Sequence, residues 1–193
     1  VFDQYGGELW KNLVSHFLSQ ALDVFGVSGA LPMLRVSALK NIAFADGSIF
    51  DESYHSYKED VDMAFRLRSA GYSSFVLLDA VAYHDRSAVG SKESSMSATV
   101  KNKQDQSNWV KYNSYKNHLT TIYKNEYGLN FLLDFPFVLW YELRKFGYFL
   151  LFDRPILKGL KDIWVWRKDI KKKRLEIKTK RKVIWKEMRK LFN

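Results

Sequence analysis

Apolar residues recur with two different periods along the chain, and these periods predict its secondary structure. From Glu8 to Phe25 they lie at near-helical spacing, which predicts a helix followed by a short strand and a glycine turn over residues 26–32. The segment 36–42 predicts a short helix, and Ala45-Asp46-Gly47-Ser48 predicts a turn. The first third of the chain therefore mixes helical and extended elements.

The clearest amphipathic pattern lies in the middle of the sequence. Apolar positions from about Glu59 to Ala70 have helical spacing, and Gly71 stands where a left-handed C-terminal cap is expected. Residues 74–78 and 80–83 are rich in β-branched and aromatic residues, which predicts two extended segments. A helix followed by strands is typical of an α/β fold.

The second half is richer in aromatic residues. Residues 90–106 lack apolar periodicity and predict a loop, whereas 108–127 regain helical spacing. Residues 129–152 are mostly apolar, but four charged side chains interrupt them, which disfavours a membrane-spanning helix. Two interpretations stay open for this segment: helices that lie at a membrane interface, or an ordinary pair of core helices.

Bulk composition narrows the class of protein. The chain has 193 residues, of which 47% are hydrophobic, so it is long enough for one main globular unit and is not disordered in bulk. It has no cysteine, which excludes disulfides and thiolate metal sites. It starts at Val1 without an initiator Met or a signal-peptide pattern, so we expect it to begin within a longer protein.

The net charge of +10 is concentrated at one end. Residues 1–153 hold 15 Lys and Arg against 17 Asp and Glu, whereas residues 154–193 hold 16 against 4. Basic residues near an anionic leaflet attract a protein to it, and nucleic acid could use the same charges. We favour the membrane over nucleic acid because the adjacent segment is apolar, a property that binding to a phosphate backbone does not require.

Candidate chemistry gathers at the start of the central helix. Glu59, Asp60 and Asp62 place three carboxylates within four positions, and His84 follows one strand length later. Acidic residues are stabilised in a first helical turn, so helix capping or solvation alone could explain them. A histidine at a strand end is likewise compatible with an ordinary structural role. The alternative is a reaction centre made of carboxylates and an imidazole.

An ordered set of short motifs distinguishes these alternatives. The motifs are Phe25–Ala30, Met33–Arg35, Phe50–Glu52, Tyr57–Asp62, Arg66–Arg68, Ala70–Tyr72, Ala80–His84 and Ser87. Their order and spacing resemble the C-terminal half of family 2 glycosyltransferases, especially the rhamnosyltransferase-like branch that builds bacterial cell-surface polysaccharides. The resemblance is close over about residues 25–125 and looser over the tail.

The resemblance implies an α/β fold of the GT-A (Rossmann-like) type. Residues 1–127 would form the acceptor-side half of the catalytic domain, and 128–193 an aromatic and basic tail of amphipathic α-helices that associates with membrane. The donor-binding half and its Asp-x-Asp motif are missing from these residues, and 24 residues before Phe25 are too few to supply a βαβ unit. We therefore expect the chain to be an incomplete and inactive piece of a larger transferase.

The resemblance also implies roles for individual residues. Asp60 would be the catalytic base, flanked by Glu59 and Asp62, and His84 would help to hold a divalent cation (Mg²⁺ or Mn²⁺) or the donor diphosphate. Substrate-binding positions would be Ser28, Gly29, Lys116 and Asn117. Lys116-Asn117 replaces the Arg-Asn common in the family, and lysine lacks the bidentate geometry of arginine.

The implied activity is inverting transfer of a sugar, with rhamnose as the first candidate, from a nucleotide-sugar donor to a glycan or lipid-linked acceptor. The protein would be cytoplasmic and peripheral on the inner face of the cytoplasmic membrane. The alternative is a non-catalytic module whose basic tail binds membrane or RNA. Trp109 is expected in the core, with a sugar-stacking platform as the second interpretation.

Overall fold

The computed structural model describes residues 21–78, 80–81 and 106–192. They are mostly helical with one small sheet, so the mixed α/β class is confirmed in this coarser form. The elements, in chain order, are β1 (Ala21–Val24), α2 (Val36–Ile42), the 3₁₀ helix η1 (Glu52–Tyr54), α3 (Glu59–Ser69), β2 (Ser74–Leu77), α5 (Asn108–Asn125), α6 (Gly128–Phe152), the 3₁₀ helix η2 (Arg154–Leu157), α7 (Lys158–Val165), α8 (Arg167–Lys180) and α9 (Trp185–Lys190).

The sheet consists of two antiparallel strands. β1 pairs with β2 in a register that runs from Ala21 opposite Leu77 to Val24 opposite Ser74. The prediction of a helix up to Phe25 is wrong for residues 21–24, because pairing with β2 gives this segment its backbone hydrogen bonds. Most of that predicted helix, most of the 90–106 loop and residues 82–83 of the second extended segment lie outside the described residues.

The apolar core lies between α2 and α3, and both helices confirm the sequence prediction. Their buried side chains are Ala38, Ile42, Met63, Leu67 and Ala70. Gly71 has a φ of +88°, as expected for the residue that ends a helix with a left-handed turn. The core therefore anchors the helix that carries the candidate carboxylates.

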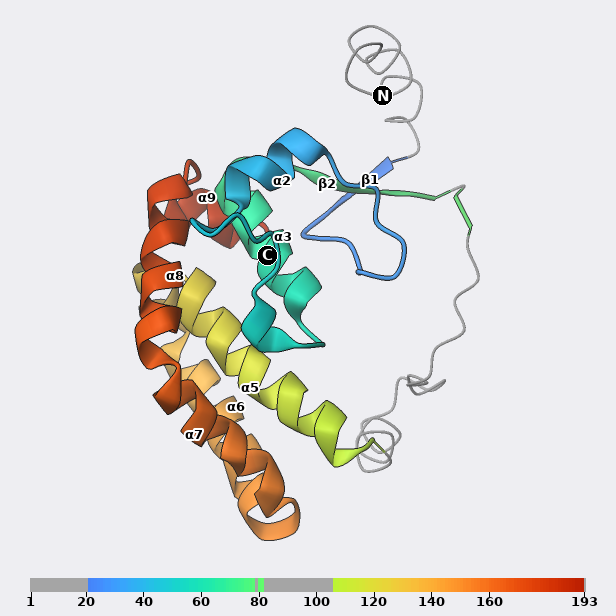
Figure 1. Ribbon diagram of the computed structural model, residues 1–193. Coiled ribbons are helices and arrows are strands. Elements are labelled where there is room, and N and C mark those ends of the chain that lie inside the picture. Colours follow the sequence, from blue (N-terminus) through green and yellow to red (C-terminus); the bar gives the residue numbers. More distant parts are fainter. Residues whose placement is uncertain (1–20, 79, 82–105, 193) are drawn as a thin grey trace, which may run out of the picture.

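Helix α5 runs through the middle of the molecule (Figure 1). It contacts α3 on one side and α7, η2 and α8 on the other. Its buried residues are mainly polar, namely Asn113, Tyr115, Asn117, Thr120, Thr121, Lys124 and Asn125. A helix that buries amides and an ammonium needs specific partners for them, and these partners form the site described below.

The tail contacts the body at several points. The N–H groups of Lys182 and Val183 both donate to the carbonyl oxygen of Ser69, at 2.8 and 3.1 Å. Near the C-terminus the ring of Phe192 lies 4.8 Å from that of Phe25 and 5.9 Å from that of Phe65. Segments on the two sides of the predicted division at residue 127 therefore pack together.

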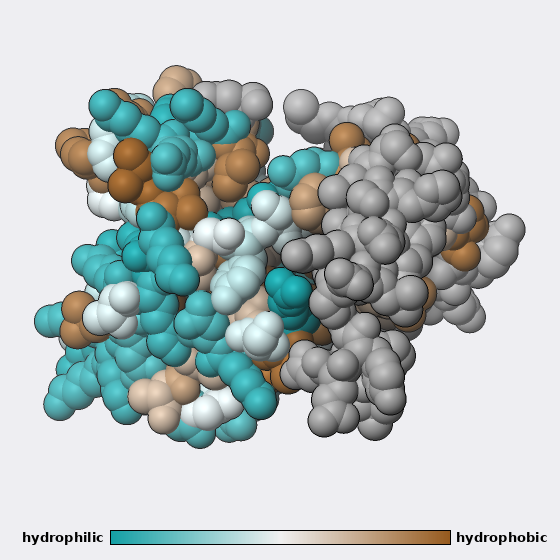
Figure 2. Space-filling view, turned by 90° about the horizontal axis from the view of Figure 1, so that it is seen from above, coloured by the Kyte–Doolittle hydropathy of each residue, from teal (hydrophilic) through white to brown (hydrophobic). Residues whose placement is uncertain are grey.

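Helix α6 continues unbroken for 25 residues despite Pro136 in its interior. Asn130 is its one buried residue, so the prediction of a core helix pair is wrong for this segment. Within the described residues, no helix combines the length and the apolar character that crossing a membrane requires. Seen from above, the described surface is mostly hydrophilic, with hydrophobic residues gathered in patches (Figure 2).

Candidate functional site

The loop that follows β1 lies along helix α3. The ring centroid of Phe25 is 4.7 Å from that of Phe65, and a Cβ added at Gly26 would lie 2.3 Å from the Cβ of Ala64. No side chain fits in such a gap, so Gly26 is required for this close approach. The contact directs the next residues of the loop toward the N-terminus of α3.

At that terminus the loop reaches Asp60. The backbone N–H of Gly29 donates to Asp60 Oδ2 at 3.1 Å, and the N–H of Val61 donates to Oδ1 at 2.8 Å. These donors and the first turn of α3 stabilise negative charge on the carboxylate. An ionised carboxylate offers about four lone-pair positions, so two donated bonds leave it able to accept from a further hydroxyl.

Two of the other predicted binding residues are placed nearby by the same loop. Gly29 contacts Asp60 directly through its backbone N–H, and its role in substrate binding stays a prediction. The Ser28 hydroxyl accepts from the N–H of Ala30 at 3.4 Å, as in a turn, and both residues are exposed. A ligand role for Ser28 stays a prediction.

The segment before α3 has an unusual backbone. His55, Tyr57 and Lys58 have φ values of 55°, 70° and 71°, in a region that non-glycine residues rarely adopt. A conformation of this kind persists only when its surroundings hold it in place.

Asn117, from α5, holds this segment. Its side chain is fully buried, and its Nδ2 lies 2.9 Å from the carbonyl oxygen of Tyr54 and 2.8 Å from those of Ser56 and Tyr57. Lys116 Nζ donates to the carbonyl oxygen of Ser53 at 2.8 Å, and burial lowers the pKa of this lysine. These contacts make Lys116 and Asn117 positioning residues for the start of α3, and substrate binding by them stays a prediction.

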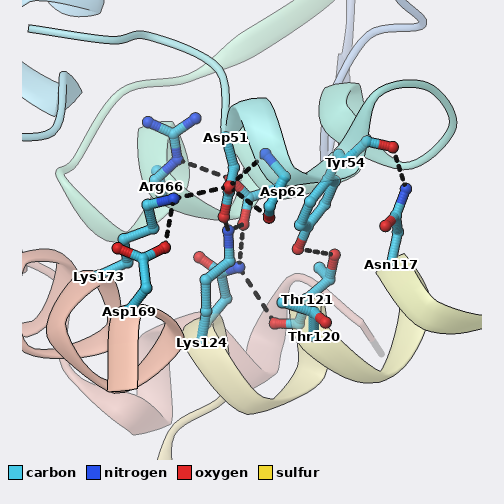
Figure 3. A network of polar contacts seen from close by, with 12 residues as sticks. Asp51, Tyr54, Asp62, Arg66, Asn117, Thr120, Thr121, Lys124, Asp169 and Lys173 are labelled. Atoms are coloured by element: carbon cyan, nitrogen blue, oxygen red, sulfur yellow. Dashed lines mark hydrogen bonds and ion pairs between the residues drawn. The ribbon is translucent and has the colours of Figure 1, made fainter. Parts of the chain in front are cut away.

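Asp62 lies on a different side of the helix from the loop. It is 1% exposed and accepts from Arg66 Nε at 3.0 Å, from Lys124 Nζ at 2.9 Å and from Asn125 Nδ2 at 2.7 Å (Figure 3). A buried carboxylate with three donors is a structural group, because removing any partner would leave a charge without compensation. The sequence had left open whether Asp62 is solvated or orients a base, and the structure shows that it is not solvated.

Asp51 completes the buried network. It is 3% exposed, forms an ion pair with Lys124 and accepts from Lys173 Nζ, in α8, at 2.8 Å. Lys173 also pairs with Asp169 at 2.8 Å. Burial alone would raise the pKa of Asp51, but the charge and hydrogen bond of Lys124, with bonds from Lys173 and Ser53, hold it well below its usual range.

Tyr54 lies beside this network. Its hydroxyl is within hydrogen-bond distance of Thr121 Oγ1, at 2.8 Å, and the Lys124 ammonium is 4.4 Å from its ring centroid. Burial, and then the charge of Asp62, raise the pKa of Tyr54 well above its ordinary value. The network in Figure 3 therefore ties α3, α5 and α8 together behind the candidate site.

Two aromatic residues lie on the segment before α3 and at the start of α5. The ring centroids of Tyr57 and Trp109 are 5.8 Å apart in an edge-to-face arrangement, and 55% of Trp109 is exposed. The prediction that Trp109 belongs to the core is therefore wrong. Its exposed ring agrees with the second interpretation, a surface on which a sugar could stack.

Glu59 is the third carboxylate of the cluster predicted from the sequence, and His84 is the predicted metal ligand. Glu59 Oε2 is buried and accepts no hydrogen bond from the described residues. His84 lies outside the described residues. In the part of the chain that the structure describes, no three His, Asp or Glu side chains group together as ligands for a metal ion. Asp62 is paired with Arg66 and Lys124, and binding of a divalent cation stays a prediction.

No family model, no curated protein and no solved structure matches the chain.

Proposed function

We propose that this chain is the acceptor-side half of an inverting glycosyltransferase of the GT-A type, family 2, with Asp60 as the catalytic base. The observation that carries the proposal is the contact between Gly29 and Asp60. Two motifs of the family resemblance, 31 residues apart in sequence, meet there at a helix N-terminus. Asp62, by contrast, is enclosed in ion pairs and takes no part in the chemistry.

The proposed reaction is a single displacement at the anomeric carbon of a nucleotide sugar. The oxygen of an acceptor hydroxyl forms a bond to that carbon while the bond to the nucleotide diphosphate breaks. The hydroxyl proton passes to the Asp60 carboxylate. Because the hydroxyl attacks from the side opposite the departing diphosphate, the anomeric configuration inverts. A divalent cation, which the resemblance implies, would offset charge on the departing diphosphate, and the residues described here do not supply its ligands.

The surroundings of Asp60 suit a base that must stay in one place. Gly29 and Val61 fix the carboxylate through two N–H groups, and Asn117 fixes the backbone that enters the helix. A catalytic group that is held before the substrate arrives loses little free energy to reorganisation during the reaction. We propose that Trp109, exposed next to Tyr57, stacks on a sugar ring of the acceptor.

The test is Asp60→Asn in the product of the complete gene, assayed for transfer from a panel of nucleotide sugars. Loss of a general base slows catalysis about 10²- to 10⁴-fold, so kcat should fall by that amount while donor binding stays within a few-fold of wild type. The matched control is Asp46→Asn, because Asp46 is an exposed aspartate that accepts its hydrogen bonds from Ser48 in a turn, away from Asp60. Near-normal turnover by Asp60→Asn would remove Asp60 from the mechanism. A wild-type protein that transfers no sugar yet binds membrane or RNA would favour the non-catalytic module.

A further inference from the structure

Helix α6 directs three of its polar side chains, Asn130, Asp134 and Glu142, toward other parts of the protein. Asn130 Nδ2 donates to the carbonyl oxygen of Trp185 at 3.1 Å, and Asp134 pairs with both terminal nitrogens of Arg189, at 2.8 and 2.9 Å. Two turns further on, Glu142 Oε1 lies 2.9 Å from His118 Nε2. A spacing of four residues places Asn130 and Asp134 on one stripe of the helix, and Glu142 lies about 80° around the helix from Asp134.

The other side of α6 is apolar and exposed. More than half of the surface of each of these residues is accessible: Leu129, Leu132, Leu133, Phe137, Trp140, Leu143 and Leu151. A surface helix in water has the opposite arrangement, with apolar residues inward and charges outward. The inverted pattern of α6 therefore suits an apolar medium on its outer side.

The segments after α6 add basic and aromatic residues to the same part of the chain. Arg154, Lys158 and Lys161 are exposed in η2 and α7, and Arg144 is the charged residue on the outer side of α6. Trp164 and Trp166 follow at the end of α7, each more than half exposed. Indole rings and basic side chains favour the level of lipid headgroups.

We propose that the outer face of α6 docks on an anionic lipid bilayer and lies in the plane of its surface. The flanking basic residues select lipid over a second copy of the chain, since they complement anionic headgroups and would repel one another across a two-fold interface. In the proposed arrangement, Phe137 and Trp140 lie among the acyl chains, and Arg154, Lys158 and Lys161 lie at the phosphates. The proposal rests on α6 and η2–α7 alone and does not depend on the transferase activity.

The test is co-sedimentation of the chain with vesicles of phosphatidylcholine alone or with 30 mol% phosphatidylglycerol (a composition on the order of that of an anionic leaflet). Phe137→Glu should weaken binding to the anionic vesicles about tenfold or more, since it places a charge within the apolar face. Leu175→Glu is the matched control, because Leu175 is an exposed leucine on α8 and the change adds the same charge there. Its binding should stay within about threefold of wild type.

Both variants replace exposed side chains, so their circular dichroism and unfolding midpoints should match wild type. A second readout is tryptophan fluorescence, whose blue shift on adding anionic vesicles should shrink in Trp140→Phe. Equal binding by Phe137→Glu and Leu175→Glu would overturn the proposal. So would a concentration-dependent dimer that Phe137→Glu abolishes while vesicle binding is absent.

Discussion

Asn117→Ala should release the backbone segment that leads into α3. The amide of Asn117 has two hydrogens, which three buried or half-buried carbonyl oxygens share at 2.8 to 2.9 Å. Those carbonyls belong to Tyr54, Ser56 and Tyr57, next to or within the run of positive φ values. Truncation removes both donors. The carbonyl of Tyr54 keeps the N–H of Ser56 as a partner, whereas the carbonyls of Ser56 and Tyr57 lose the donor from Asn117.

The expected cost follows from these contacts. Each buried acceptor left unsatisfied costs about 1–3 kcal/mol, so two lost donors cost roughly 2–6 kcal/mol. Relaxation of three left-handed residues, worth about 1–2 kcal/mol each, returns part of this once the segment moves. A net loss of about 2–4 kcal/mol in the free energy of unfolding is expected, against a typical total of about 5–15 kcal/mol.

The assay is urea unfolding combined with hydrogen exchange of the amides of residues 55–60. Asn113→Ala is the matched control, since Asn113 is 1% exposed on the same helix but its amide donates at 3.0 Å to the carbonyl of Trp109 in its own helix. It should cost no more than about 1 kcal/mol. If both variants unfold alike and exchange at residues 55–60 is unchanged in Asn117→Ala, the positioning role of Asn117 is refuted.

Two further predictions concern the same region. Gly26→Ala should lower the thermal midpoint of unfolding, because the added Cβ would lie 2.3 Å from the Cβ of Ala64. The second substitution Ala64→Gly in the same chain should restore the midpoint. Gly128→Ala is the control and should have little effect, because an added Cβ there meets no atom within 4 Å. A Gly26→Ala protein as stable as Gly128→Ala would contradict the close approach. Because the pKa of Asp51 is lowered in the folded protein, its contribution to stability is complete above its ordinary pKa of about 3.9 and is lost as pH falls below that value. Asp51→Asn should therefore lower the free energy of unfolding by about 3–5 kcal/mol at pH 7 and by clearly less at pH 3. Urea unfolding of wild type and variant at both pH values measures this. A loss of stability that is the same at both pH values would count against the ion pair.

Local pattern was sufficient for α2, α3, α5 and β2. The helical spacing of apolar residues predicted α2, α3 and α5 within a few residues of their observed ends. It failed at β1, where pairing with a strand some 50 residues later decides the conformation, and a single-sequence pattern cannot register such a partner.

The buried network had a partial signal in the sequence. Asp62 and Arg66 are four residues apart on one helix, and the polar residues of α5 recur at helical spacing from Asn113 to Lys124. A polar stripe on the inner side of a central helix indicates buried partners. The sequence could not predict that Lys124 pairs with both Asp51 and Asp62. Both aspartates are more than 60 residues away from it in sequence, and tertiary packing brings them together.

For the candidate site, the sequence indicated the acidic start of α3 but could not separate its carboxylates. Asp60 and Asp62 are two residues apart, so they point about 200° apart around the helix and meet different surroundings. One meets the N–H of Gly29 and the other meets Arg66 and Lys124. This divergence assigns the proposed chemistry to Asp60 alone.

The most direct measurement for this assignment is rescue of Asp60→Ala by formate in the product of the complete gene. Formate can occupy the space left by the side chain and accept the proton, so sugar transfer by Asp60→Ala should be nearly absent and should rise with formate concentration. Asp62→Ala, which removes a buried partner of Arg66 and Lys124, should lose stability and show no rescue. Transfer by Asp60→Ala close to the wild-type rate without formate would contradict the account.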